Sequence, residues 1–113
     1  MKHKVVLVPF PFDDLSSTKV RPAVCLTEPV GQHKHVILAF ITSRVPDEPL
    51  STDLVFSDTE KDFATTGLRV SSTLQLHRMM TVASNIIVRE LGILPKSAQK
   101  DVEGKLKLLF GIK

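Results

Sequence analysis

The sequence is poor in cysteine and in long apolar runs. Its single cysteine, Cys25, cannot form a disulfide within the chain or build a Cys-rich metal site, and it favours a reducing compartment. No apolar run approaches the ~18 residues that span a bilayer. The short apolar stretch 5–8 is not followed by a signal-peptide cleavage site. We therefore expect a cytoplasmic protein that is neither secreted nor embedded in a membrane.

The residues of several common catalytic sites are also missing. The five glycines are scattered, so no glycine-rich loop could hold a nucleotide phosphate. No His-Glu-x-x-His metal motif and no Gly-x-Ser-x-Gly elbow occur. Asp13 and Asp14 could hold a hard cation, but a solvated turn is the more common role of such a pair. Cys25 lies in an apolar strand, where a buried, inert thiol is usual. The sequence predicts no metal and no cofactor.

Tryptophan and tyrosine are absent as well, and the six aromatic residues are all phenylalanine. A platform for stacking nucleic-acid bases would have to use Phe10, Phe12, Phe63 or a histidine. For most of the phenylalanines, burial in the core is the more common role.

The remaining composition is that of one folded domain, 1–113. The chain has 42% hydrophobic and 24% charged residues, which are ordinary globular values. Its net charge is +3, a mild bias toward anionic partners that a solvated basic surface explains equally well.

Apolar patterning predicts several strands followed by one helix. The segments with strand patterns are 4–10, 21–27, 35–42, 53–56, 69–82 (one or two strands) and 86–88, and 57–66 is predicted to be a loop. The segment 35–42 is almost entirely apolar, which is typical of a strand buried on both faces.

The C-terminal segment changes to a helical period. Apolar residues at helical spacing predict an amphipathic helix whose buried positions are Ala98, Val102, Leu106, Leu109 and Phe110. Ser97 is the predicted N-cap, and Gly104 should cost ~1 kcal/mol relative to alanine. The predicted fold class is mainly β (α+β): a small barrel-like or curled sheet with a helix packed on it.

Two cations open the second predicted strand. Lys19 and Arg21 follow a stiff Pro-x-Pro segment and a short polar loop, and they would project to the same side. The planar fork of arginine can bind a phosphate bidentately. Arg21 could instead form a surface salt bridge with Asp13 or Asp14.

Motifs along most of the chain resemble one family. They are, in chain order, VPFPF at 8–12, KVRPA at 19–23, FITS at 40–43, TGL at 66–68 followed by Ser72, MTV at 80–82 and LGIL at 91–94 before the closing helix. Together they resemble the MazF/PemK toxins of bacterial type II toxin–antitoxin systems. The resemblance implies a small SH3-like barrel of about five to seven antiparallel strands with a C-terminal helix, usually a homodimer.

The resemblance also implies an activity and a partner. The expected activity is metal-independent, sequence-specific cleavage of single-stranded RNA, often mRNA, and a cognate MazE-like antitoxin would neutralise it. The catalytic arginine and threonine of the family fall on Arg21 and Thr42. Ser43 and Ser72 match its substrate contacts.

The remaining candidates for RNA binding are basic or aromatic. Lys19 and Arg44 would add positive potential for the RNA backbone, and Phe12 could stack on a base. RNA can be cut when its own 2′-hydroxyl attacks the adjacent phosphorus. In this hypothesis Arg21 stabilises the developing negative charge, and Thr42 donates a hydrogen bond to the same phosphate.

Other interpretations remain open. Thr42 ends an apolar strand, where a threonine is often structural. The ending Phe110-Gly111-Ile112 partly matches the aromatic-Gly-Ile ending through which CcdB toxins poison DNA gyrase, although we expect Phe110 to be a core residue of the helix. A catalytically silent binding module is the third possibility. The motifs around Arg21 and Thr42 favour the ribonuclease.

Overall fold

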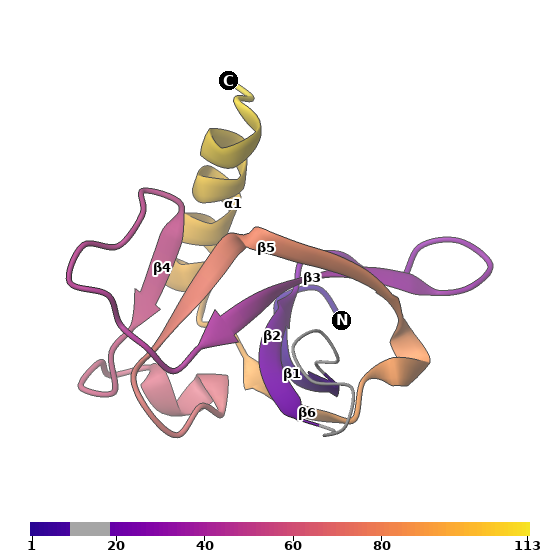
Figure 1. Cartoon of the computed structure of the whole chain (residues 1–113), viewed down its shortest axis with the longest axis horizontal. Coiled ribbons are helices and arrows are strands. Elements are labelled where there is room, and N and C mark those ends of the chain that lie inside the picture. The colour runs from indigo at the N-terminus through magenta and orange to yellow at the C-terminus, as the bar shows by residue number, and fades with distance from the viewer. Residues whose placement is uncertain (10–18) are drawn as a thin grey trace.

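The computed structural model describes residues 1–9 and 19–113. These ranges fold into six β-strands, two short 3-10 helices (η1 and η2) and one α-helix (Figure 1). The elements are β1 (Lys4–Pro9), β2 (Val20–Cys25), β3 (His35–Thr42), β4 (Asp53–Phe56), η1 (Phe63–Thr66), β5 (Ser72–Ala83), η2 (Ser84–Ile86), β6 (Arg89–Ile93) and α1 (Lys96–Phe110). In the described ranges, no helix has the length and apolar character needed to cross a membrane.

All six strands form one antiparallel sheet in the order β4-β5-β3-β2-β1-β6. The sheet curls into a half-barrel, and α1 packs beside β4 and β5 (Figure 1). The predicted fold class, a small curled antiparallel sheet with a C-terminal helix, is therefore confirmed.

Most of the predicted strands are also confirmed. The segments 4–10, 21–27, 35–42 and 53–56 correspond to β1, β2, β3 and β4, and 69–82 corresponds to the single strand β5. The predicted strand at 86–88 is wrong, because β6 lies further along the chain, at Arg89–Ile93. β6 is an edge strand, and its exposed Arg89 and Glu90 weaken the apolar pattern that would have revealed it. Part of the predicted loop 57–66 forms η1.

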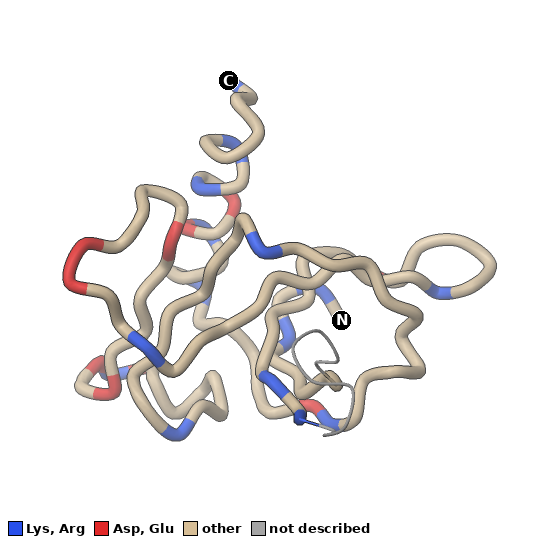
Figure 2. The backbone as a smooth tube through the Cα atoms, viewed as in Figure 1, with Lys and Arg blue, Asp and Glu red and all other residues tan. Residues whose placement is uncertain are grey.

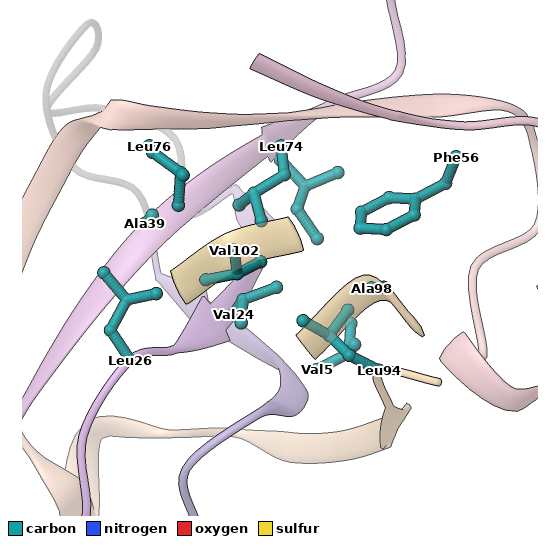
Figure 3. Close-up of a cluster of buried hydrophobic side chains, with 11 residues drawn as sticks. Val5, Val24, Leu26, Ala39, Phe56, Leu74, Leu76, Leu94, Ala98 and Val102 are labelled. Carbon is teal, nitrogen blue, oxygen red and sulfur yellow. The ribbon is translucent and has the colours of Figure 1, made fainter. Parts of the chain in front are cut away.

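The two faces of the sheet carry two separate clusters of buried side chains. Because successive residues of a strand point to opposite faces, Val24 joins the first cluster and Cys25 the second. Ala39 and Phe40 divide in the same way, so β3 contributes to the core on both faces, as predicted. The first cluster lies between the sheet and α1 (Figure 3), and its buried members are Val5, Val24, Leu26, Ala39, Ile41, Phe56, Leu74, Leu76, Leu94, Ala98 and Val102.

Helix α1 confirms the predicted period but differs at both ends. Ala98 and Val102 are buried against the sheet. The N-cap is Pro95 and makes no side-chain capping bond, so the prediction for Ser97 is wrong by two positions. Phe110 is 60% exposed, and its prediction as a core residue is also wrong. The last turns of α1 extend beyond the sheet (Figure 1), so nothing in the described fold covers this end.

Candidate functional site

Three adjoining cavities surround the C-terminal end of β3. The central cavity, of about 300 Å³, is lined by Arg21, by residues 40–44, and by Gln75 and Arg78 of β5. The outer cavity, of about 720 Å³, is lined by Thr42, residues 44–47, Gln75 and Arg78. The side cavity, of about 260 Å³, is lined by Leu7, Arg21, Pro22, Ile41, Ser43, Gly67, Leu68, Arg69, Val70, Ser72, Arg89 and Leu91. The central cavity shares lining residues with each of the other two, and we call the three adjoining cavities together the hollow.

The charges around this hollow are strongly one-sided. All five arginines of the chain line the three cavities, and none of the ten lysines does. No carboxylate is among the described residues that line the central or side cavity, and the outer cavity has only Asp47. The acidic positions of the described chain lie mostly around β4 and α1 (Figure 2). The hollow therefore attracts anions, and its guanidinium groups can bind them bidentately.

Thr42 occupies the last position of β3, where the strand enters the central cavity. Its hydroxyl oxygen accepts a hydrogen bond of 3.3 Å from the backbone N–H of Arg44. A hydroxyl has one donor and two acceptor positions, so this bond leaves the O–H of Thr42 available to a ligand. The half-buried side chain is thus oriented by its own loop.

The loop that follows β3 is fixed to the neighbouring strand. Thr73 of β5 is fully buried, and its hydroxyl donates a 2.8 Å hydrogen bond to the backbone carbonyl of Arg44. A buried partner of this kind holds the backbone of Ser43 and Arg44 in one position. The exposed side chains of these two residues therefore start from a preorganised backbone.

β5 brings two residues to the site through an irregularity in its pairing with β3. Ala39 pairs with Met79, but the next residue, Phe40, pairs with Gln75. Residues 76–78 therefore have no partner on β3, and Arg78 reaches the central cavity from this bulge. Bulges commonly redirect side chains next to functional sites.

A close backbone contact forms one wall of the side cavity. A Cβ atom on Gly67 would lie 2.2 Å from the carbonyl oxygen of Leu91, and one on Gly92 would lie 2.3 Å from that of Thr65. Gly67 also has φ +73°, which favours glycine. Only glycine at both positions lets the segment after η1 approach β6 this closely. The contact brings Arg69 and Arg89 to the same cavity.

The described cysteine and histidine side chains outside the three cavities do not form a second candidate catalytic or metal site. Cys25 is buried, and burial raises its pKa to about 11, so the thiol stays protonated at neutral pH. Partial burial lowers the pKa of His3, which lies away from the three cavities. Within 1–9 and 19–113, no three His, Cys, Asp or Glu residues are grouped as metal ligands would be.

A comparison with family models shows which protein family the chain belongs to. The model described as "PemK-like, MazF-like toxin of type II toxin-antitoxin system" matches residues 2–110. The chain belongs to this family. A search of curated protein sequences gives no significant match.

Solved structures of PemK/MazF-like toxins have the same fold at low sequence identity. The Mycobacterium tuberculosis toxin MazF-mt6 is 20% identical, with a TM-score of 0.73 over 97% of this chain and 98% of that one. MazF from Deinococcus radiodurans is 18% identical, with a TM-score of 0.71 over 98% and 96%. A mycobacterial endoribonuclease in complex with its cognate antitoxin is 9% identical, with a TM-score of 0.71 over 100% and 94%.

In this PemK/MazF-like toxin, four of the predicted site residues lie together. Arg21, Thr42, Ser43 and Arg44 all line the central cavity, although Arg21 is on β2, Thr42 ends β3, and Ser43 and Arg44 lie in the loop after β3. Sequence motifs therefore located one wall of the cavity.

The other predicted residues are placed differently. Ser72 lines the side cavity, but it is only 3% exposed, and its hydroxyl donates a 2.8 Å hydrogen bond to the carbonyl of Val70. Lys19 is exposed just before β2 and lines none of the three cavities. Phe12 lies outside the described residues, as do Asp13 and Asp14, the alternative partners of Arg21.

Among the lining residues that sequence reasoning missed are Gln75 and three arginines, Arg69, Arg78 and Arg89. Gln75 and Arg78 belong to a predicted strand, but a pattern within one strand does not reveal a change of register with its neighbour. Arg69 and Arg89 are 20 residues apart in sequence and meet through the contact at Gly67 and Gly92. The sequence offered one signal for the three missed arginines: the chain has only five arginines against ten lysines.

Proposed function

We propose that this PemK/MazF-like toxin is an endoribonuclease that cleaves single-stranded RNA, with mRNA as its main substrate class, by attack of the 2′-hydroxyl on the adjacent phosphorus. One observation carries the proposal: Arg21, Arg44, Arg78 and Thr42 line the same central cavity, with no carboxylate among its described lining residues. Cations and an oriented donor are what a phosphorane-like transition state requires.

Arg21 stabilises the charge that develops on the non-bridging phosphate oxygens. Its guanidinium is exposed on β2 and lines both the central and the side cavity. Two parallel N–H donors can bind two phosphate oxygens at once, which a lysine ammonium cannot do in the same geometry.

Thr42 donates its free O–H to the same phosphate while its oxygen accepts the N–H of Arg44. In the reaction, the bond from the 2′-oxygen to phosphorus forms and the bond from phosphorus to the 5′-oxygen breaks. The proton of the 2′-hydroxyl leaves, and the 5′-oxygen gains one. The products are a 2′,3′-cyclic phosphate and a 5′-hydroxyl, and the balance needs no metal ion.

Further binding roles belong to the same hypothesis. Ser43 and Arg44 contact the RNA backbone at the central cavity, and Ser72 supports the wall of the side cavity. Lys19 adds positive potential at the start of β2, and Phe12 stacks on a base.

The regulatory partner is a cognate MazE-like antitoxin. One similar solved structure is a MazE–MazF complex from Deinococcus radiodurans, 18% identical to this chain. For this chain, an acidic segment of the antitoxin would occupy the arginine-lined cavities and exclude RNA, because both ligands are anionic.

We further propose a homodimer. The end of α1 exposes three large apolar side chains, Leu108, Phe110 and Ile112, and a second copy would cover them. Light scattering after size exclusion should give twice the 12.5 kDa chain mass. The same measurement on Phe110→Asp should give the monomer.

The deciding experiment is cleavage of a long single-stranded RNA in the presence of EDTA. We expect discrete fragments with cyclic phosphate ends from the parent and none from Arg21→Ala. Lys100→Ala removes a cation from α1, far from the cavities, and should cut like the parent. Equal cutting by the parent and Arg21→Ala would contradict the proposed chemistry.

A second candidate function rests on the exposed end of α1. Phe110 and Ile112 are 60% and 61% exposed, and they belong to the Phe-Gly-Ile ending that partly matches gyrase poisons. If the folded protein cuts no RNA, inhibition of gyrase supercoiling that Phe110→Ala abolishes would favour this function. Absence of both activities, with antitoxin binding retained, would indicate a silent binding module.

A further inference from the structure

The side cavity adjoins the central cavity but differs from it in chemistry. The two share Arg21, Ile41 and Ser43, so a chain bound with its phosphate in the central cavity can extend toward the side cavity. The central cavity is lined mainly by polar residues. Half of the residues that line the side cavity are apolar: Leu7, Pro22, Ile41, Leu68, Val70 and Leu91.

A cavity lined by both apolar and cationic side chains suits a flat, aromatic ligand. The faces of a nucleobase are apolar and stack on such surfaces, while its edges need hydrogen-bond partners. The guanidinium planes of Arg69 and Arg89 can meet either a face or an edge.

The polar side chains that line the side cavity are mainly hydrogen-bond donors. Among the described residues, the side chains of Arg69 and Arg89 form no hydrogen bond or ion pair. A guanidinium has only N–H donors and no acceptor. The hydroxyl proton of Ser72 is already donated to Val70. No Asp, Glu, Asn or Gln is among the described lining residues to accept a hydrogen bond.

The walls of this cavity are held in place. The hydroxyl of Thr66 donates to the carbonyl of Phe63 at 2.7 Å and accepts the N–H of Leu68 at 3.2 Å. The hydroxyl of Ser71 accepts the N–H of Asp58 at 2.8 Å. With the close contact at Gly67, these bonds fix the segment that carries Arg69. A preformed cavity binds its ligand at a lower entropic cost.

We propose that the side cavity binds one base of the RNA next to the scissile phosphate and prefers the keto bases, guanine and uracil, over the amino bases, adenine and cytosine. The inference rests on the proposed RNA-cleaving function. Guanine presents O6 and N7, and uracil its carbonyl oxygens, to the two arginines. Adenine and cytosine would direct an exocyclic amino group, itself a donor, at the N–H donors of the two arginines. The amino group and the guanidinium would then both lack an acceptor.

A binding assay with non-cleavable ligands tests the preference directly. The probes are short 2′-deoxy oligonucleotides in which every position but one is abasic and the remaining base is guanine, uracil, adenine or cytosine. They lack the attacking 2′-hydroxyl, so affinity is measured without turnover. For the parent, we expect the guanine and uracil probes to bind about tenfold more tightly than the other two.

Charge-conserving variants assign the preference to the cavity. Arg69→Lys and Arg89→Lys keep the charge but lose the planar fork, so each should bind all four probes within about twofold to threefold of one another. Arg44→Lys makes the same change in the central and outer cavities and should keep the tenfold preference.

The outcomes separate this inference from the proposed function. Equal binding of the four probes, or a preference for amino bases, would overturn the inference, as would a keto preference that both side-cavity variants retain. If the parent still cuts long RNA in any of these cases, the ribonuclease function stands. If the parent neither binds the probes nor cuts RNA, both proposals are wrong.

Discussion

The arginines and the lysines of this PemK/MazF-like toxin occupy different regions. Five arginines line the hollow around the end of β3, whereas five of the ten lysines lie on α1 or just after it. Both regions are basic, but only the hollow combines cations with cavities, oriented hydroxyls and a fixed backbone. Positive charge on a helix surface keeps a protein soluble, and positive charge in a preorganised cavity can recognise a particular anion.

The largest expected effect follows from replacing a cavity arginine with a lysine. Arg21→Lys keeps the charge but loses the bidentate geometry, so RNA cleavage should fall about 100-fold, on the scale of one lost oxyanion contact. Lys100→Arg on α1 makes the reverse exchange and should leave the rate unchanged. Single-turnover cleavage of a fluorescent RNA measures both. Full activity of Arg21→Lys would mean that charge alone is sufficient at this position.

Alanine substitutions at two glycines compare the stability of the cavity wall with that of α1. Gly92→Ala places a Cβ against the backbone of Thr65 and Thr66, and it should lower the free energy of unfolding by ~1–3 kcal/mol. Gly104→Ala meets no atom within 4 Å in the exposed middle of α1 and should raise it by about 1 kcal/mol. Urea denaturation measures both changes. Equal effects of the two substitutions would contradict the close packing of the cavity wall.

Two part-buried hydrogen bonds test whether an effect on stability also affects activity. Thr73→Val removes the 2.8 Å bond that fixes the carbonyl of Arg44, and Gln99→Met removes the 2.8 Å bond from Gln99 to the carbonyl of Leu94 at the start of α1. Each should cost about 1 kcal/mol of unfolding free energy. Only Thr73→Val should also slow RNA cleavage, by about tenfold, because it loosens the loop after β3. If both variants cut at the parent rate, the fixed loop has no role in the reaction.

The smallest effect concerns salt. RNA affinity should fall as salt rises, and Arg44→Leu should flatten the plot of log affinity against log salt by about 0.7, the value for one lost phosphate contact on a single strand. Lys96→Leu on α1 should leave the slope unchanged. Titrations between low and moderate salt measure it, and equal slopes for the two variants would contradict the comparison of the two regions.

The sequence predicted the parts of the fold and site that depend on local pattern. The alternation along β1, β2 and β3 and the helical spacing from Ala98 onward follow from burial, which any short window of sequence records. The motifs around Arg21 and Thr42 are contiguous, so they could be found without knowing the pairing of the strands.

The rest depends on how distant segments meet. Arg78 reaches the central cavity because three residues of β5 lack partners on β3, and Arg89 reaches the side cavity because two glycines allow a close contact. Phe110 fits the apolar period of α1, but whether it is buried depends on where the sheet ends. None of these facts is encoded within a single window of sequence.

The single, fully buried thiol of Cys25 can report local opening of the sheet through its reaction with an alkylating reagent. Its side chain lies in the second core cluster between β1 and β3, and its raised pKa suppresses the reactive thiolate in the native state. An alkylating reagent can therefore modify the protein only when the centre of the sheet opens. With a single cysteine, each modified molecule records one such opening, so the rate of mass gain follows the opening of the sheet around β2 without any engineered label.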